Sequence, residues 1–104
     1  MDKIIEENYK VTVDRGCISP STKLFDFLDK LEEETEELIK EALRPREISN
    51  LPEELADVIM VCLNMAKHYN IDIEQEIKNK IEINRKRINK FLLVIFKAFN
   101  LGIT

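Results

Sequence analysis

Residues 22–43, TKLFDFLDKLEEETEELIKEAL, carry the pattern that decides the fold of this chain. Apolar residues recur there at the spacing of one helical face, which predicts a long amphipathic helix. The stripe consists of Leu24, Phe27, Leu28, Leu31, Thr35, Leu38 and Ala42. Glu34, Glu37 and Glu41 border one edge of this stripe, so we expect their carboxylates to be half-buried beside the core.

Three further helices are predicted by similar spacing. Residues 2–14 favour a short helix, and the sequence RGCISP at 15–20 ends it because Gly and Pro disfavour its continuation. A linker at 44–49 precedes a helix over about 51–69, and a break at 70–71 precedes a fourth helix. The chain is therefore predicted to be all-α, with antiparallel helical hairpins forming a four-helix-bundle-like core completed by oligomerisation.

Residues that can cap a helix precede three of these segments. A polar side chain at this position accepts a hydrogen bond from a backbone N–H, and a Glu or Gln three residues later completes a capping box. The candidates are Ser21 or Thr22 for the helix at 22–43, Asn50 with Glu53 for the helix at 51–69, and Asp72 with Gln75 for the fourth helix.

Length and charge limit what the chain can be. We expect one domain over 1–104 with its core motifs at 22–90, and a domain this small is marginal unless a second subunit shares its core. The net charge of −4 disfavours a nucleic-acid partner. Residues 1–8 lack a secretory signal, which predicts a cytoplasmic protein. Cys17 and Cys62 have no zinc-type spacing, so we expect both to be reduced and structural.

The segment at 91–100 is apolar on all sides. Because it contains Lys97 and is too short to span a bilayer, no membrane partner is expected. A helix with this pattern is typical of a buried or intersubunit position.

Two carboxylate pairs form the candidate site. Glu34 with Glu37 and Glu54 with Asp57 are each spaced so that their side chains project about 60° apart on one side of a helix. Taken alone, the pair Glu34 and Glu37 is equally typical of a solvated helical face. The pair Glu54 and Asp57 is equally typical of acidic residues that interact favourably with the dipole at the start of a helix. The short linker makes the two helices antiparallel neighbours, and both pairs then lie at a similar height, about 9 Å from the linker. Carboxylates gathered in this way would repel one another, which predicts bound Mg²⁺, with Mn²⁺ as a substitute, rather than Zn²⁺.

The fourth helix offers the complementary charge. Lys80, Asn84 and Arg87 share one side, and Asn84 falls inside the apolar stripe. Surface ion pairing is the alternative interpretation of Lys80 and Arg87. Beside a metal cluster, this face indicates a polyphosphate ligand. His68 is about 16 Å along its helix from Asp57, so we do not expect it to share the metal.

Three blocks of sequence resemble one family when taken in order. They are LEEETEEL at 31–38, EELADVI at 53–59 and KIEINRKR at 80–87. Over roughly 22–90 the chain resembles the MazG-like nucleotide pyrophosphohydrolases of the all-α NTP pyrophosphatase superfamily. The resemblance implies Mg²⁺-dependent hydrolysis of a nucleoside triphosphate, NTP or dNTP, to the monophosphate and pyrophosphate, as nucleotide-pool housekeeping.

The resemblance also implies roles for particular residues. Those that match the family's metal ligands are Glu34, Glu37, Glu54 and Asp57, and those that match its nucleotide-facing segment are Lys80, Asn84 and Arg87. Glu33 matches a glutamate that orients or deprotonates the attacking water. Family members assemble as homodimers or homotetramers with sites near subunit contacts, which agrees with the small size of the chain.

A second hypothesis belongs to another class of protein. The chain would be a non-catalytic helical dimerisation or regulatory module that retains the family scaffold, with the apolar segment at 91–100 as its partner-binding helix. Uptake of Mg²⁺ or Mn²⁺ separates this hypothesis from the enzyme.

Overall fold

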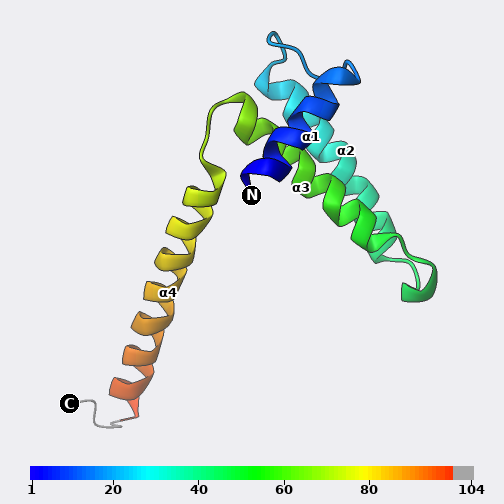
Figure 1. Ribbon diagram of the computed structural model, residues 1–104. Helices are drawn as coiled ribbons and strands as arrows, with labels where there is room; N and C mark the ends of the chain where they lie inside the picture. The colour runs from blue at the N-terminus through cyan, green and yellow to red at the C-terminus, as the bar shows by residue number, and fades with distance from the viewer. Residues whose placement is uncertain (100–104) are drawn as a thin grey trace. The chain divides into compact units, whose positions relative to one another are not determined.

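The structure is a computed structural model of the chain, and it describes residues 1–99. These residues form the helices α1 (Asp2–Asp14), α2 (Leu24–Ala42), α3 (Leu51–His68) and α4 (Ile73–Ala98), with the 3₁₀ turn η1 (Arg46–Ile48) between α2 and α3 (Figure 1). No strand occurs in the part of the chain that the structure describes. The predicted all-α class is confirmed, and the helix bounds agree with the sequence pattern to within about two residues.

The chain divides into two compact units, one over Met1–Ile71 and one that begins at Asp72. The first unit contains α1, α2 and α3, and the second contains α4. The organisation of residues 1–104 as a single domain stays a prediction.

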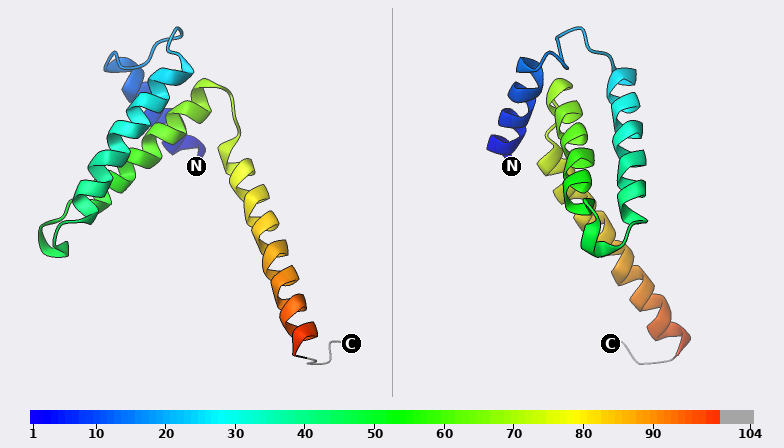
Figure 2. Two further views of the ribbon diagram at one scale, coloured as in Figure 1. Left: turned by 180° about the vertical axis from the view of Figure 1, so that it is seen from behind. Right: turned by 90° about the vertical axis from the view of Figure 1, so that its right-hand side faces the viewer.

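Within the first unit, α2 and α3 form an antiparallel hairpin, and α1 packs against α3 (Figure 2). The buried apolar residues of this unit are Ile18, Phe27, Val61, Leu63 and Ala66. Ile18 comes from the segment before α2, Phe27 comes from α2, and the other three come from α3. Phe27, which belongs to the predicted stripe of α2, is therefore part of a small core.

Part of the predicted α3 core is wrong for the described chain. The apolar spacing of residues 51–69 predicts that Leu55, Ile59, Cys62 and Tyr69 are buried, yet all four are exposed. The physical reason is that α3 packs against both α1 and α2, which turns Val61 and Asn64 inward instead. Leu55 and Ile59 are left as an apolar strip on the opposite side of α3, 48% and 50% exposed. Cys17 and Cys62 are both free and exposed.

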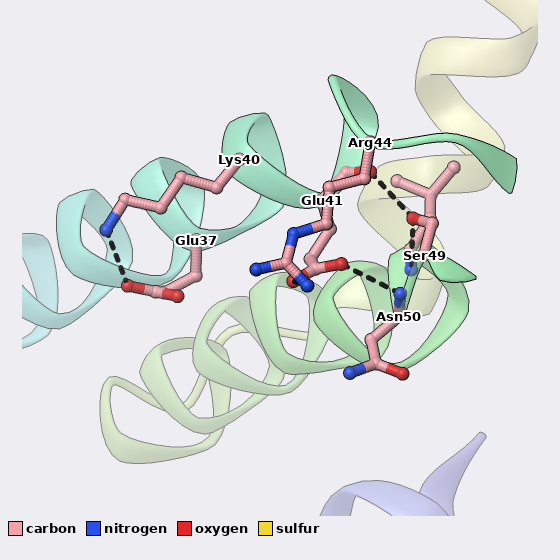
Figure 3. Close-up of polar contacts among 7 residues, drawn as sticks. Glu37, Lys40, Glu41, Arg44, Ser49 and Asn50 are labelled. Carbon is pink, nitrogen blue, oxygen red and sulfur yellow. Dashed lines mark hydrogen bonds and ion pairs between the residues drawn. The ribbon is translucent and has the colours of Figure 1, made fainter.

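A buried carboxylate orders the linker between α2 and α3. Glu41 Oε2 accepts a hydrogen bond from the backbone N–H of Asn50 at 2.9 Å, and the Ser49 hydroxyl donates to the carbonyl of Glu41 at 2.6 Å (Figure 3). Asn50 is the N-cap of α3, as predicted, but its side chain makes no capping hydrogen bond. The predicted capping box of Asn50 with Glu53 is therefore wrong, and Glu41 of the preceding helix satisfies this end of α3.

The other two predicted caps have different outcomes. The N-cap of α2 is Lys23 rather than Ser21 or Thr22, and its backbone N–H donates to Asp26 Oδ2 at 2.9 Å. Thr22 does not cap α2, because its hydroxyl accepts a hydrogen bond from the backbone N–H of Ser19 instead. The Asp72 cap of α4 is confirmed, since its carboxylate accepts from the backbone N–H of Gln75 at 3.1 Å.

The helix α4 runs without a break through the segment predicted as an apolar helix at 91–100, as far as Ala98. Residue 100 lies outside the described residues. No residue of α4 is buried, and Phe91 is 64% exposed. An intersubunit role for this end of α4 stays a prediction. None of the helices in residues 1–99 has the combined length and hydrophobicity that a membrane span requires.

Candidate metal centre

Three of the four predicted metal ligands lie together. Glu34 comes from α2, and Glu54 and Asp57 come from the first turns of α3. One carboxylate oxygen from each lies within 4.8 Å of the others, and all three residues are half-buried. The antiparallel hairpin produces this contact, because it brings the middle of α2 beside the start of α3. Carboxylates from two helices thus meet at one point.

The electrostatics of the cluster centre on Glu54. Its Oε2 atom is buried and has no hydrogen-bond partner in residues 1–99. Burial raises the pKa of the Glu54 carboxyl, and the negative charges of Asp57, Glu34, Glu37 and Glu53 raise this pKa further. An ionised carboxylate in such surroundings is unfavourable unless a cation or a proton neutralises it. The cluster therefore has the concentration of negative charge that favours binding of a cation.

Lys30 provides one positive charge beside the cluster. Its Nζ lies 3.0 Å from Glu34 Oε1 and 3.5 Å from Glu33 Oε1. The hydrogen bond to Glu34 raises the pKa of the Lys30 ammonium. Lys30 precedes Glu34 by one helical turn, and this spacing was the signal by which the sequence could have revealed it.

Glu37 and Glu33 occupy other positions. Glu37 lies outside the close group of three carboxylates, and its Oε1 is 3.3 Å from the ammonium of Lys40 (Figure 3). Its charge still contributes to the raised pKa of Glu54. The side chain of Glu33 is 65% exposed and pairs with Lys30. The metal-binding role of Glu37 and the catalytic role of Glu33 both stay predictions.

A cavity of about 540 Å³ adjoins the cluster. Glu34 and Asp57 line it, together with Lys30 and with side chains from α1, from the segment before α2 and from the middle of α3. Its size lies within the range of about 300–1,000 Å³ that is usual for small-molecule sites. The carboxylates therefore face a space large enough for a substrate.

Part of this cavity is formed by polar residues that the sequence analysis missed. Asn8 of α1 and Asn64 of α3 are 9% and 7% exposed, and a hydrogen bond of 2.9 Å joins them. Thr12 of α1 accepts a further hydrogen bond from Asn64 at 3.0 Å. The available signal was Asn64 itself, because it is an amide between the apolar residues Leu63 and Ala66.

His68 has contacts away from the carboxylates. Its Nε2 is 2.9 Å from the backbone carbonyl of Thr22, and its Nδ1 is 2.8 Å from the hydroxyl of Tyr9. The ring of Phe27 packs against the imidazole, with 4.9 Å between ring centroids. These contacts give His68 a structural role that joins α1, α3 and the segment before α2.

The predicted nucleotide-facing residues belong to α4, in the second unit. Lys80, Asn84 and Arg87 are all exposed, and Arg87 Nη1 lies 3.5 Å from Asn84 Oδ1. Arg85, on another side of the helix, pairs with Glu82 instead. The participation of Lys80, Asn84 and Arg87 in the site stays a prediction.

Comparison with protein families matches residues 18–91 to the MazG-like family. The chain belongs to the MazG-like family. The match covers more than half of the sequence and includes the three carboxylates of the cluster. It begins after α1, so Asn8 and Thr12 lie outside it. Comparisons with curated proteins and with solved structures found no match.

The donors in this MazG-like chain fit the divalent cation that the family implies. Carboxylate oxygens are the ligands that Mg²⁺ and Mn²⁺ prefer. The buried Oε2 of Glu54 lacks a partner among the described residues, and a cation would supply one. Glu34, Glu54 and Asp57 are therefore the residues that would hold it.

Proposed function

We propose that the chain hydrolyses a nucleoside triphosphate, NTP or dNTP, to the nucleoside monophosphate and pyrophosphate, with Mg²⁺ bound by Glu34, Glu54 and Asp57. Membership of the MazG-like family indicates a hydrolase that acts on nucleotides. The observation that carries the proposal is the meeting of these three carboxylates beside a cavity, with a buried Glu54 oxygen that lacks a partner in residues 1–99.

In the proposed reaction, water attacks the α-phosphorus and the bond from that phosphorus to the bridging oxygen breaks. Pyrophosphate leaves with the electrons of that bond, and the water proton passes to a general base. A divalent cation supplies charge neutralisation at phosphate oxygens and lowers the pKa of a bound water. Glu33 is the proposed base or water-orienting group, because it adjoins Glu34 on α2 and its side chain is open to solvent.

Positive side chains would stabilise the negative charge that develops on the leaving pyrophosphate. Lys30 lines the cavity and already pairs with Glu34. We propose Lys80, Asn84 and Arg87 of α4 for the same task, with Glu37 as an additional carboxylate at the cation site. We also expect a homodimer or homotetramer, since Leu55 and Ile59 leave an apolar strip exposed on α3.

The direct test is pyrophosphate release from a panel of NTPs and dNTPs, with Mg²⁺ and with a chelator. We expect Mg²⁺-dependent release from at least one nucleotide. Glu34→Gln and Asp57→Asn should each lower the rate by at least about a hundredfold, as expected when a ligand of a catalytic metal is lost. Glu36→Gln is the matched control, because Glu36 is an exposed residue of the same acidic run and should leave the rate unchanged.

The second candidate is a non-catalytic dimerisation or regulatory module that retains the family scaffold. The exposed apolar side chains at the end of α4, including Phe91 and Val94, favour a partner-binding role. Calorimetric titration with Mg²⁺ and Mn²⁺ separates the two candidates. Uptake of neither ion, with or without nucleotide, would favour the module over the enzyme.

A further inference from the structure

We propose that the amide groups of Asn8 and Asn64 bind the hydrogen-bonding edge of a nucleobase and determine which base the site accepts. This inference rests on the proposed function, because it places the nucleoside of that substrate. The family match does not extend to Asn8, which lies on α1 before the matched residues.

Two backbone carbonyls fix the orientation of the amide network. The carbonyl of Met60 can only accept, so the Asn8 atom 3.1 Å from it is the Nδ2 donor. The other proton of this Nδ2 is donated to Asn64 Oδ1 at 2.9 Å. Asn64 Nδ2 donates to Thr12 Oγ1 at 3.0 Å, and the Thr12 hydroxyl donates to the carbonyl of Asn8 at 2.8 Å.

These four hydrogen bonds leave one acceptor and one donor of the two amides unused. The acceptor is Asn8 Oδ1, and the donor is the second proton of Asn64 Nδ2. Both side chains are more than nine-tenths buried and line the cavity. A ligand or water in the cavity that offers a donor beside an acceptor can satisfy both groups. The edge of a nucleobase offers both groups side by side.

The position of the pair along the cavity suits the nucleoside of a phosphate-bound nucleotide. Asp57 and Asn64 lie on one side of α3, about 10 Å apart along the helix axis. The carboxylates thus mark one end of the cavity, for phosphates, and the amides mark the other. Phe27 and Val61, only 4% and 8% exposed, add apolar surface to the lining, which suits the flat face of a base.

Equilibrium binding to the full chain tests the proposal without turnover. The probes are the α,β-methylene analogues of the four dNTPs and inorganic tripolyphosphate, each titrated by calorimetry in the presence of Mg²⁺. We expect at least one analogue to bind about tenfold or more tightly than tripolyphosphate, since a satisfied polar pocket discriminates strongly. Equal affinities for all four analogues and for tripolyphosphate would overturn the proposal.

Asn64→Asp replaces the amide nitrogen with an acceptor oxygen with little change in shape, and this also removes the hydrogen bond to Thr12. We expect the affinity for the preferred analogue to fall about tenfold, with a smaller change for tripolyphosphate. Glu36→Gln is the control, because Glu36 is exposed and does not line the cavity, and it should leave the base preference unchanged. An unchanged base preference in Asn64→Asp would overturn the proposal.

A measurement on the unaltered protein covers the case in which Asn64→Asp does not fold. The preferred analogue is compared with a version that carries a methyl group on the hydrogen-bonding edge of its base. We expect at least about tenfold weaker binding, and equal binding would overturn the proposal.

The inference and the proposed function fail in distinguishable ways. Pyrophosphate release from all nucleotides at equal efficiency would support the proposed reaction and contradict the proposed nucleobase site. Base-selective binding of the analogues, without pyrophosphate release from any nucleotide, would support the nucleobase site and contradict the proposed reaction.

Discussion

His68 Nε2 donates a hydrogen bond of 2.9 Å to the backbone carbonyl of Thr22, which joins the end of α3 to the segment before α2. A carbonyl can only accept, so Nε2 carries a proton, and Nδ1 lies 2.8 Å from the Tyr9 hydroxyl. One imidazole therefore connects three segments that are distant in the sequence. Thr22 lines the cavity, and this contact consequently helps to define the amide end of the site.

Removal of this imidazole should destabilise the first unit. We expect His68→Ala to lower the free energy of unfolding by about 1–3 kcal/mol, because the Tyr9 hydroxyl and the Thr22 carbonyl lose a half-buried partner. Tyr9→Phe removes only one of the two hydrogen bonds and should have a smaller effect. Urea unfolding followed by circular dichroism measures both changes. Wild-type stability in His68→Ala would show that the contact contributes nothing.

The raised pKa of Glu54 predicts an unusual dependence of stability on pH. The folded chain retains the Glu54 proton to a higher pH than the unfolded chain, whose value is near 4.5. The free energy of unfolding should therefore fall as the pH rises from 4.5 through the raised folded pKa, in the absence of divalent cations.

Glu54→Gln should be more stable than the wild type at neutral pH, and the difference should shrink toward pH 4. Urea unfolding with a chelator between pH 4 and pH 8 measures this, with the exposed neighbour in Glu53→Gln as the control. Mg²⁺ should then stabilise the wild type more than Glu54→Gln, because only the wild type retains the carboxylate. A difference that is constant with pH would contradict the assigned cause.

Lys30 should compete with a divalent cation for Glu34. Its ammonium is 3.0 Å from Glu34 Oε1. The positive charge of Lys30 therefore repels a cation bound at the cluster, and its hydrogen bond occupies the Glu34 oxygen that the cation would use. We expect Lys30→Met to strengthen Mn²⁺ binding by roughly two- to fivefold, which corresponds to the modest energy of a partly exposed ion pair. Calorimetric titration with Mn²⁺ measures the change. Lys40→Met, which frees Glu37 instead, is the matched comparison.

The face of α4 predicts a contrast between two neighbouring arginines. Arg87 shares its side of the helix with Lys80 and Asn84, whereas Arg85 pairs with Glu82. We expect Arg87→Ala to lower kcat/KM for the preferred nucleotide by about ten- to a hundredfold, the effect of losing a charge-assisted hydrogen bond. Arg85→Ala should change it by less than about threefold. Equal losses in both variants would contradict the predicted face.

The sequence predicts the helices and the carboxylate cluster because both depend on local spacing. Periodic apolar residues mark α2, and a short linker forces its neighbour to return beside it, so Glu34 and Asp57 meet. The Asn8 and Asn64 pair could not be predicted in this way, since it depends on how α1 packs across α3. The Glu54 environment has the same origin, because its burial arises only once α2 and α3 pack together.

Glu41 is the clearest case of a tertiary contact that replaces a local one. Its carboxylate accepts from the backbone N–H of Asn50 at 2.9 Å and lies 3.7 Å from Arg44, with only 11% of its side chain exposed. Because it fixes the start of α3 against the end of α2, it also sets the register that brings Glu54 and Asp57 to Glu34.

We expect Glu41→Ala to cost about 1–2 kcal/mol of stability, as the loss of a helix N-cap does. It should also weaken Mn²⁺ binding, although Glu41 lies outside the close group of three carboxylates. Glu41→Gln retains an acceptor oxygen and should preserve most of both properties. Urea unfolding and calorimetry on the two variants measure the effects, and equal losses in Glu41→Ala and Glu41→Gln would assign the role to charge rather than to the hydrogen bond.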